Sequence, residues 1–170
     1  MKRTSALFAV FVALNASAFA ATPHATPVPG GANQASGVAG TFGGKLFNGE
    51  VRLVPKEIRD AIDADGLTAV DGQKWIVFTA SASNGTAHAL DMQQFVASIV
   101  DADDNTIQAQ PDKLKPVGGV YGVVPGGAWK EQIAFEVPQN FIPVKIVLLP
   151  NDRKHQAFRI TVRADDYRRS

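Results

Sequence analysis

The sequence predicts an all-β fold, namely an immunoglobulin-like antiparallel β-sandwich with one short helix. Six short segments carry apolar residues at alternate positions and are separated by Gly, Pro, Asn and Asp, a pattern typical of half-buried strands. Only one segment has helical spacing, whereas a parallel α/β sheet requires a helix between most of its strands. A barrel is the competing architecture, because strand number alone does not separate it from a sandwich.

The chain begins with the features of a removable signal peptide at residues 1–20. Two basic residues precede an apolar run over residues 6–14, and Ala18 and Ala20 place small side chains before the expected cleavage point. The apolar run is shorter than the roughly 20 residues that span a bilayer, so it suits a signal better than an anchor. We therefore expect export to the periplasm or the extracellular space.

Charge and cysteine content restrict the partners of the exported chain. Removal of residues 1–20 takes away two of the 17 Lys and Arg residues and none of the 16 Asp and Glu residues, so the formal charge becomes −1. This balance argues against nucleic acid or an anionic membrane bound through overall charge, and no membrane insertion is expected. The chain has no cysteine, so an apolar core must supply its stability without disulfides.

Residues 21–40 are predicted to form a flexible tether. They are rich in Pro, Gly and Ala and show no apolar periodicity, so they contain little that could pack. The remaining residues 41–170 are predicted to form one β-sandwich domain, since a chain of this length buries a sizeable core by itself.

The predicted strands differ in how many of their faces are apolar. Phe158–Arg163 alternates most regularly, and a shift of one residue would bury both of its arginines, so its register is strongly determined. Two other segments also have one polar face, whereas the remaining three are largely apolar on both faces and suit central strands. In chain order the six segments are Glu50–Leu53, Lys74–Ser83, Phe95–Val100, Gln132–Val137, Val144–Leu149 and Phe158–Arg163.

The one predicted helix covers Pro55–Ile62. Proline is favoured in the first turn of a helix, and Ile58 and Ile62 are four residues apart, so both would lie on one helical face. We expect this helix to connect two strands.

Four groups of residues carry a resemblance to a known family through their order and spacing. They are Gly43–Leu46, then Lys74–Phe78 leading to Ser83–Thr86, then Phe95–Asp101 with the turn Asp104-Asn105, and finally Pro125–Gly127 before Ile133–Pro138. Over most of residues 40–163 this order resembles a group of exported bacterial immunoglobulin-like domains catalogued as the domain of unknown function number 4352. The resemblance implies a fold and a compartment but no mechanism. Many members are lipoproteins anchored through a cysteine that this chain lacks, which implies a soluble exported version. The chain is also similar to small bacterial proteinase-inhibitor domains of the same sandwich type.

The acidic segment Asp101–Asn105 has two competing interpretations. Its alternating oxygen-bearing side chains look like the start of a calcium loop. The glycine at the sharp turn and the closing glutamate of such a loop are absent, so a hairpin turn explains the segment better. Asp63–Gly66 and Asp71-Gly72 are interpreted as turns in the same way.

The sequence offers no convincing catalytic group, metal site or cofactor site, so we expect no enzyme activity. The three histidines, His24, His88 and His155, lie in the tether, in a loop and just before the last strand, which does not favour one metal site. No serine has the strained Gly-x-Ser-x-Gly turn of a hydrolase. Asp165 and Asp166 are adjacent and are interpreted as part of a solvated tail.

Two aromatic residues are the predicted partner-binding residues. Trp75 begins a strand and is expected in the core, whereas Trp129 follows a Pro-Gly turn where a sandwich end is open to partners. Tyr121 lies in the apolar, glycine-rich stretch Val117–Val124 just before it. We therefore predict contact through Tyr121 and Trp129.

Two functions remain open at this point. The first is an exported, non-catalytic binding or envelope-associated module that contacts a protein or a cell-envelope component through residues 115–129. The alternative is a secreted protease inhibitor or a stress-protective envelope protein, in which an exposed loop enters a foreign active site. The sequence identifies neither the ligand nor the oligomeric state.

Overall fold

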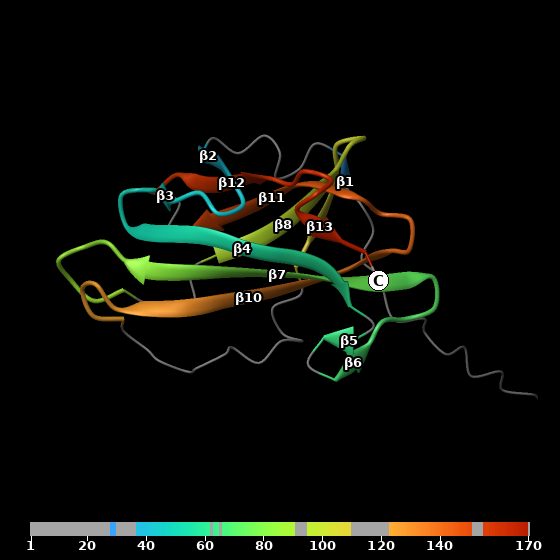
Figure 1. Ribbon diagram of the computed structural model, residues 1–170, viewed down its shortest axis with the longest axis horizontal. Helices are drawn as coiled ribbons and strands as arrows, with labels where there is room; N and C mark the ends of the chain where they lie inside the picture. The colour runs from blue at the N-terminus through green and yellow to red at the C-terminus, as the bar shows by residue number, and fades with distance from the viewer. Residues whose placement is uncertain are drawn as a thin grey trace, which may run out of the picture.

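The computed structural model describes residues 28–29, 37–61, 63–64, 66–90, 95–109, 123–150 and 155–169. In this part of the chain two β-sheets pack face to face, and no segment is helical (Figure 1). The predicted all-β sandwich is therefore confirmed. The proposed signal peptide at residues 1–20 lies outside the described residues.

Each sheet is assembled from strands that are distant in sequence. The first has the order β1-β9-β8-β11-β12-β2, and the second has the order β10-β7-β4-β13 with β3 also paired to β4. The first sheet comprises β1 (Val28–Pro29), β2 (Gly37–Thr41), β8 (Phe95–Asp101), β9 (Asn105–Gln108), β11 (Pro143–Pro150) and β12 (Ala157–Thr161). The second comprises β3 (Leu46–Phe47), β4 (Val51–Ala61), β7 (Gln73–Asn84), β10 (Ala128–Pro138) and β13 (Tyr167–Arg168), and β5 (Asp63–Ala64) and β6 (Leu67–Thr68) form a separate hairpin.

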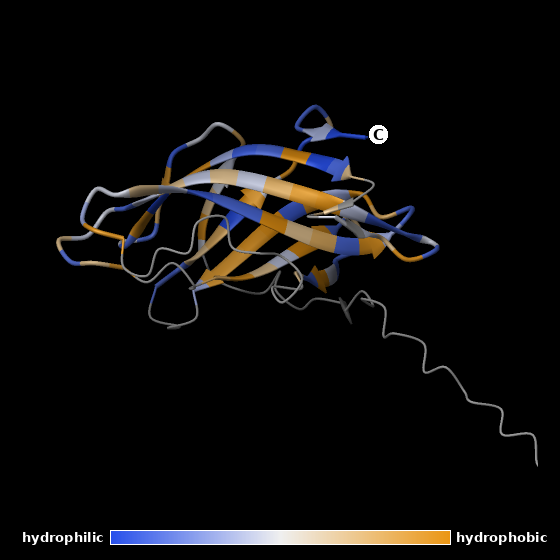
Figure 2. Ribbon diagram, turned by 90° about the horizontal axis from the view of Figure 1, so that it is seen from below, coloured by the Kyte–Doolittle hydropathy of each residue, from blue (hydrophilic) through white to orange (hydrophobic). Residues whose placement is uncertain are grey.

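The core lies between the two sheets, as the alternation of the predicted strands requires. All six of those strands are confirmed. Phe78, Phe135 and Phe158 are fully buried in the core and come from β7, β10 and β12. Burial of each such side chain contributes about 2 kcal/mol. Figure 2 shows hydrophobic and hydrophilic segments following one another along the strands.

The predicted helix at Pro55–Ile62 is wrong, because β4 continues through this segment to Ala61. A spacing of four residues is also a multiple of two, so it places side chains on one face of a strand as well as of a helix. Ile58 is fully buried and pairs with Phe78 of β7, whereas Lys56 and Arg59 are exposed. The strand accommodates Pro55 at an irregularity, where its register against β7 shifts between Pro55 and Glu57.

The predicted tether is also wrong in part, because two of its segments are strands. Residues 37–41 form β2, which pairs in parallel with β12, and residues 28–29 form β1 beside β9. A Cβ atom at Gly37 would lie 2.3 Å from the Ala157 carbonyl oxygen, so the absence of a side chain permits this close pairing. The glycine content that suggested flexibility instead allows two backbones to approach. The rest of the predicted tether lies outside the described residues.

Trp75 is buried as predicted, but on the opposite face of the second sheet from the main core. It packs with Val77 and Ala134 and with Ala64 of the β5–β6 hairpin. This hairpin covers one end of a sheet face that sequence alternation alone would leave to solvent. The turns predicted around it are confirmed at Gly66 and Gly72, which have positive φ values of 78° and 79°.

The predicted solvated tail at the C-terminus is in fact attached to the second sheet. Tyr167 is buried in β13, which pairs in parallel with β4. Its hydroxyl donates a hydrogen bond to the Asp60 carboxylate, and Lys74 Nζ lies 3.3 Å from the other Asp60 oxygen. Burial, followed by the hydrogen bond and the charge of Asp60, raises the pKa of the Tyr167 phenol above its usual range. This contact therefore closes the free side of β4 near its C-terminal end.

Candidate functional site

Trp129 lies on the strand edge of the second sheet and is less exposed than predicted. It is the second residue of β10, is half-buried and packs against the main core. Its indole Nε1 donates a 2.6 Å hydrogen bond to Glu131 Oε1. Tyr121, the other predicted partner-binding residue, lies outside the described residues. The side chain of Trp129 is therefore held by the fold, with only part of its surface open.

Glu131 lies on the same side of β10 as Trp129 and is largely removed from water. Burial raises the pKa of its carboxyl, and the hydrogen bond from Trp129 offsets part of that rise. Among the described strands, β10 is at the edge of its sheet. An inward-pointing charge on an edge strand opposes pairing with another chain.

A pH-dependent contribution to stability follows from the raised pKa of Glu131. The Glu131 carboxyl binds its proton more tightly in the folded protein than in the unfolded chain. Its contribution to the free energy of unfolding is therefore present at low pH and is lost as pH rises through the raised pKa. The Glu131→Gln variant retains an acceptor for Trp129 and does not titrate. We expect its free energy of unfolding, relative to the parent, to increase between about pH 4 and pH 7. Urea unfolding across this range measures the difference.

The control for this measurement is Glu57→Gln, at a carboxylate on the exposed side of β4. Glu57 Oε1 accepts a 3.2 Å hydrogen bond from Arg168, and both side chains face water. This variant measures the effect of the same substitution at an exposed ion pair, and the result for Glu131→Gln is compared with it. If the free energy of unfolding of Glu131→Gln relative to the parent stays constant or falls with pH, the raised pKa of the Glu131 carboxyl is contradicted.

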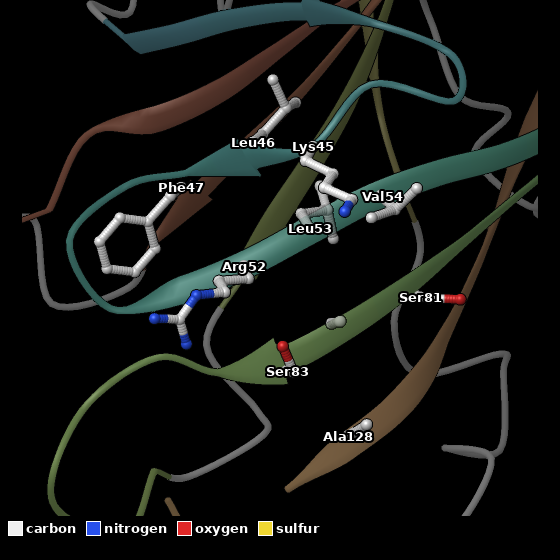
Figure 3. A pocket seen from close by; sticks show the side chains of 10 residues that line it. Lys45, Leu46, Phe47, Arg52, Leu53, Val54, Ser81, Ser83 and Ala128 are labelled. Carbon is white, nitrogen blue, oxygen red and sulfur yellow. The ribbon is translucent and has the colours of Figure 1, made fainter. Parts of the chain in front are cut away.

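A groove of about 510 Å³ lies where β3, β4, β7 and β10 meet (Figure 3). Exposed or half-buried Arg52, Val54, Ser81 and Ser83 alternate along β4 and β7 with core residues. The groove therefore opens on the sheet face that points away from the core. Its lining is Lys45, Leu46, Phe47, Arg52, Leu53, Val54, Ser81, Ala82, Ser83 and Ala128.

One end of the groove is formed by a stacked pair of side chains from neighbouring strands. Phe47 of β3 is directly opposite Arg52 of β4, and the guanidinium carbon of Arg52 lies 5.1 Å from the Phe47 ring centre. Phe47 is 46% exposed, which is unusual for a large aromatic side chain. Gly85 makes room for the pair, because a Cβ atom there would lie 2.6 Å from Phe47 Cε2.

The charged residues that line the groove are both positive. Lys45 and Arg52 both line it, and no carboxylate is among the described lining residues. Neither cation has a hydrogen bond or an ion pair with any residue that the structure describes. The hydroxyl groups of Ser81 and Ser83 likewise have no partner in this part of the chain. The groove thus presents polar groups whose bonding capacity is available to a ligand.

The end of β7 beside the groove is held by Asn84, which is fully buried. Its amide nitrogen donates 2.7 Å hydrogen bonds to the carbonyl oxygens of His88 and Val123. Its side-chain oxygen accepts hydrogen bonds from Thr86, and its backbone bonds to Gly126 and Gly127. One side chain therefore fixes the two chain segments that flank the groove.

The other candidate sites from the sequence have structural roles. Asp101 accepts backbone hydrogen bonds from Asp103 and Asn105 at 3.0 and 2.8 Å, which confirms a hairpin turn between β8 and β9. His155 Nδ1 lies 3.3 Å from a Glu50 carboxylate oxygen, whereas His88 is exposed in a separate loop. Within the described residues, no three His, Cys, Asp or Glu side chains are grouped as a metal site would require.

Sequence reasoning reached only the edge of this groove. The predicted contact segment, residues 115–129, includes one residue that lines the groove, Ala128. Lys45, Phe47 and Arg52 were missed because each looks like an ordinary surface residue. Lys45 precedes β3, Phe47 ends β3, and Arg52 is an outward residue of β4. The available signal was an aromatic residue at an outward strand position, alternating with buried Leu46.

Comparisons with known proteins show similarity of fold. No protein-family model matches the chain, and no curated protein matches it. An uncharacterized β-sandwich protein from Clostridium difficile has a TM-score of 0.51 and 11% identity, over 76% of this chain and 97% of that one. A secreted protein from Mycobacterium tuberculosis has a TM-score of 0.57 and 14% identity, over 74% and 98%. A Bacillus subtilis protein has a TM-score of 0.51 and 10% identity, over 72% and 99%.

These likenesses concern the sandwich architecture, because a shared fold hosts many unrelated functions. The resemblance to the domain of unknown function number 4352 stays a prediction. No helix long and apolar enough to cross a membrane occurs among the described residues.

Proposed function

We propose that the chain is an exported, non-catalytic binding module that holds a protein or a cell-envelope component in the groove beside β3. The observation that supports this most directly is the combination of exposed Phe47 with two cations that have no partner in the described residues. Aromatic and arginine side chains are the residue types that most often dominate binding energy. Their stacking at one end of a groove therefore favours recognition.

The groove is also well supported by the residues around it. Gly85 leaves space for the Phe47 and Arg52 pair, and its backbone N–H donates a 2.8 Å hydrogen bond to the Glu50 carbonyl. Asn84 fixes the adjoining loops. A site that is ordered before binding loses less conformational entropy when the ligand arrives. This rigidity supports binding by a pre-formed surface.

The proposed compartment rests on the signal-like residues 1–20, with periplasmic or extracellular location as the expected result. One neighbour of similar fold is a secreted protein. Tyr121 and Trp129 remain proposed contact residues. Trp129 pairs with Ala82 of β7 and packs on the core side of the sheet, so its open surface would be contacted at the edge of β10.

Affinity capture tests this function with the exported protein as bait and bacterial envelope and culture-fluid fractions as the source of partners. We expect the parent protein to retain a defined component, and Phe47→Ala and Arg52→Ala to retain about tenfold less of it. Arg163→Ala, at an exposed arginine outside the groove lining, is the matched control and should behave as the parent does.

Each other result has a definite meaning. Capture that is lost only in Trp129→Ala would move the binding site to the edge of β10. Capture of a protease together with inhibition of its activity would favour the alternative function of a secreted inhibitor. If no variant differs from the parent and nothing is retained, the binding module is contradicted.

A further inference from the structure

We infer that the groove binds an extended acidic peptide segment, one that presents a carboxylate together with an apolar side chain. This inference rests on the proposed binding function and specifies the chemistry of its ligand. It is argued from the charge of the lining, from the exposed apolar surface and from the spacing of two hydroxyl groups.

The charge of the lining selects an anionic partner. Lys45 and Arg52 line one groove, and neither is paired with a carboxylate of the described chain. A planar guanidinium presents two parallel N–H groups that match the two oxygens of a carboxylate, and such charge-assisted bonds are stronger than neutral ones. Stacking on Phe47 restricts the orientation of Arg52, so less freedom is lost when a carboxylate binds.

The apolar residues of the lining favour a ligand that carries an apolar group as well as a negative charge. Phe47, Val54 and Ala128 are each at least partly open to solvent on this side of the sheet. A small inorganic anion would leave this surface in contact with water. A ligand that also carries an apolar side chain removes it from water at a gain of about 25 cal/mol for each Å² buried.

The two serines favour an extended chain over a compact ligand. Ser81 and Ser83 are two residues apart on β7, so their hydroxyl groups repeat along the strand at about 7 Å. An extended peptide repeats its same-side groups at the same interval. A segment lying along β7 would therefore meet both hydroxyl groups in register, with Lys45 and Arg52 beside it.

The lining is poorly suited to a neutral sugar as ligand. Sugar hydroxyl groups are both donors and acceptors and are well satisfied by amide and carboxylate side chains. The described lining residues include neither type, and six of the ten are apolar. The groove therefore matches a peptide that is acidic and apolar better than it matches a carbohydrate.

Isothermal titration calorimetry tests the inference with the full exported protein and a ten-residue synthetic peptide that contains two glutamates and two leucines. A second peptide of the same sequence has glutamine in place of each glutamate. We expect the acidic peptide to bind about tenfold more tightly than the glutamine peptide, with the difference shrinking as salt is added. Lys45→Ala and Arg52→Ala should each lower the affinity for the acidic peptide about fivefold or more, and Arg163→Ala should leave it unchanged.

Folding of each variant is checked by its urea unfolding transition, and Arg52→Lys, which keeps the charge, should restore part of the binding. Equal affinity for the two peptides would overturn the inference even if partner capture still depends on Phe47 and Arg52. Absence of binding to either peptide would also overturn it. The proposed binding function is judged separately, because its capture experiment does not depend on the nature of the ligand.

Discussion

Replacing Asn84 with alanine is expected to lower the free energy of unfolding by about 3 kcal/mol, equivalent to roughly 10 °C in melting temperature. The substitution removes both donors of a fully buried amide and leaves the carbonyl oxygens of His88 and Val123 without these bonds. It also removes the acceptor for Thr86. The two carbonyl oxygens keep bonds from Thr86 Oγ1 and from the Leu90 N–H, so the expected loss is that of four side-chain hydrogen bonds at roughly 0.5–1.5 kcal/mol each. Chemical denaturation of the two proteins measures the change.

The matched control is Asn140→Ala, the same substitution at an exposed turn position between β10 and β11. We expect its effect to stay within about 0.5 kcal/mol, as for most surface positions. If both substitutions cost the same, Asn84 does not anchor the loops beside the groove. Asn84→Ala is further expected to weaken partner capture, because the groove depends on the position of these loops.

The second large effect is expected for Phe135→Ala, at about 4 kcal/mol of lost stability. Phe135 is fully buried in the main core, and its strand β10 pairs with β7 over the whole of its length. Truncation removes apolar contacts with both sheets and leaves a cavity that close-packed neighbours fill only in part. Urea unfolding should show a lower midpoint with little change in slope.

Phe47→Ala makes the same chemical change at an exposed position, where we expect a small effect on stability. This side chain is 46% exposed and stacks with Arg52, so we expect a loss of about 1 kcal/mol or less. Its effect should be on binding. Similar losses of stability at Phe47 and Phe135 would show that Phe47 is a structural residue and would count against the groove as a recognition surface.

Strands with regular alternation of apolar and polar residues were predicted correctly, because the alternation follows which side chains are buried. In Phe158–Val162, each apolar residue is buried, and Arg159 and Thr161 face away from the core. This agreement follows because one face of a packed sheet meets a core and the other meets water. The pattern is local, so it can be read without knowing which strands pair.

The errors arose where two structures share one local pattern. Ile58 and Ile62 suit a helix by spacing, yet Ile58 lies in β4 because the neighbouring β7 supplies its backbone partners. Gly37 suits a flexible linker by composition, yet it lies in β2 because β12 is available for pairing. In both cases the partner strand is distant in sequence, so local spacing could not reveal it.

The candidate site was only approached from the sequence, for the same reason. Trp129 was identified as notable, but its packing against the main core depends on residues from distant strands. The groove brings together Lys45, which precedes β3, with Arg52 of β4 and Ser83 of β7. Each looks like an ordinary surface residue alone, and their common chemistry is visible only once they are adjacent.

The sequence by itself determined the all-β class, the positions of the main strands and the faces that they bury, because these depend on the alternation of residues along one strand. Tertiary structure decided the pairing of β2 and β13, the cover over Trp75 and the grouping of two cations with Phe47. Those features depend on hydrogen bonds and contacts between segments far apart in the chain. Local pattern sets what a segment buries, whereas packing sets which surfaces meet, and the proposed binding groove belongs to the second category.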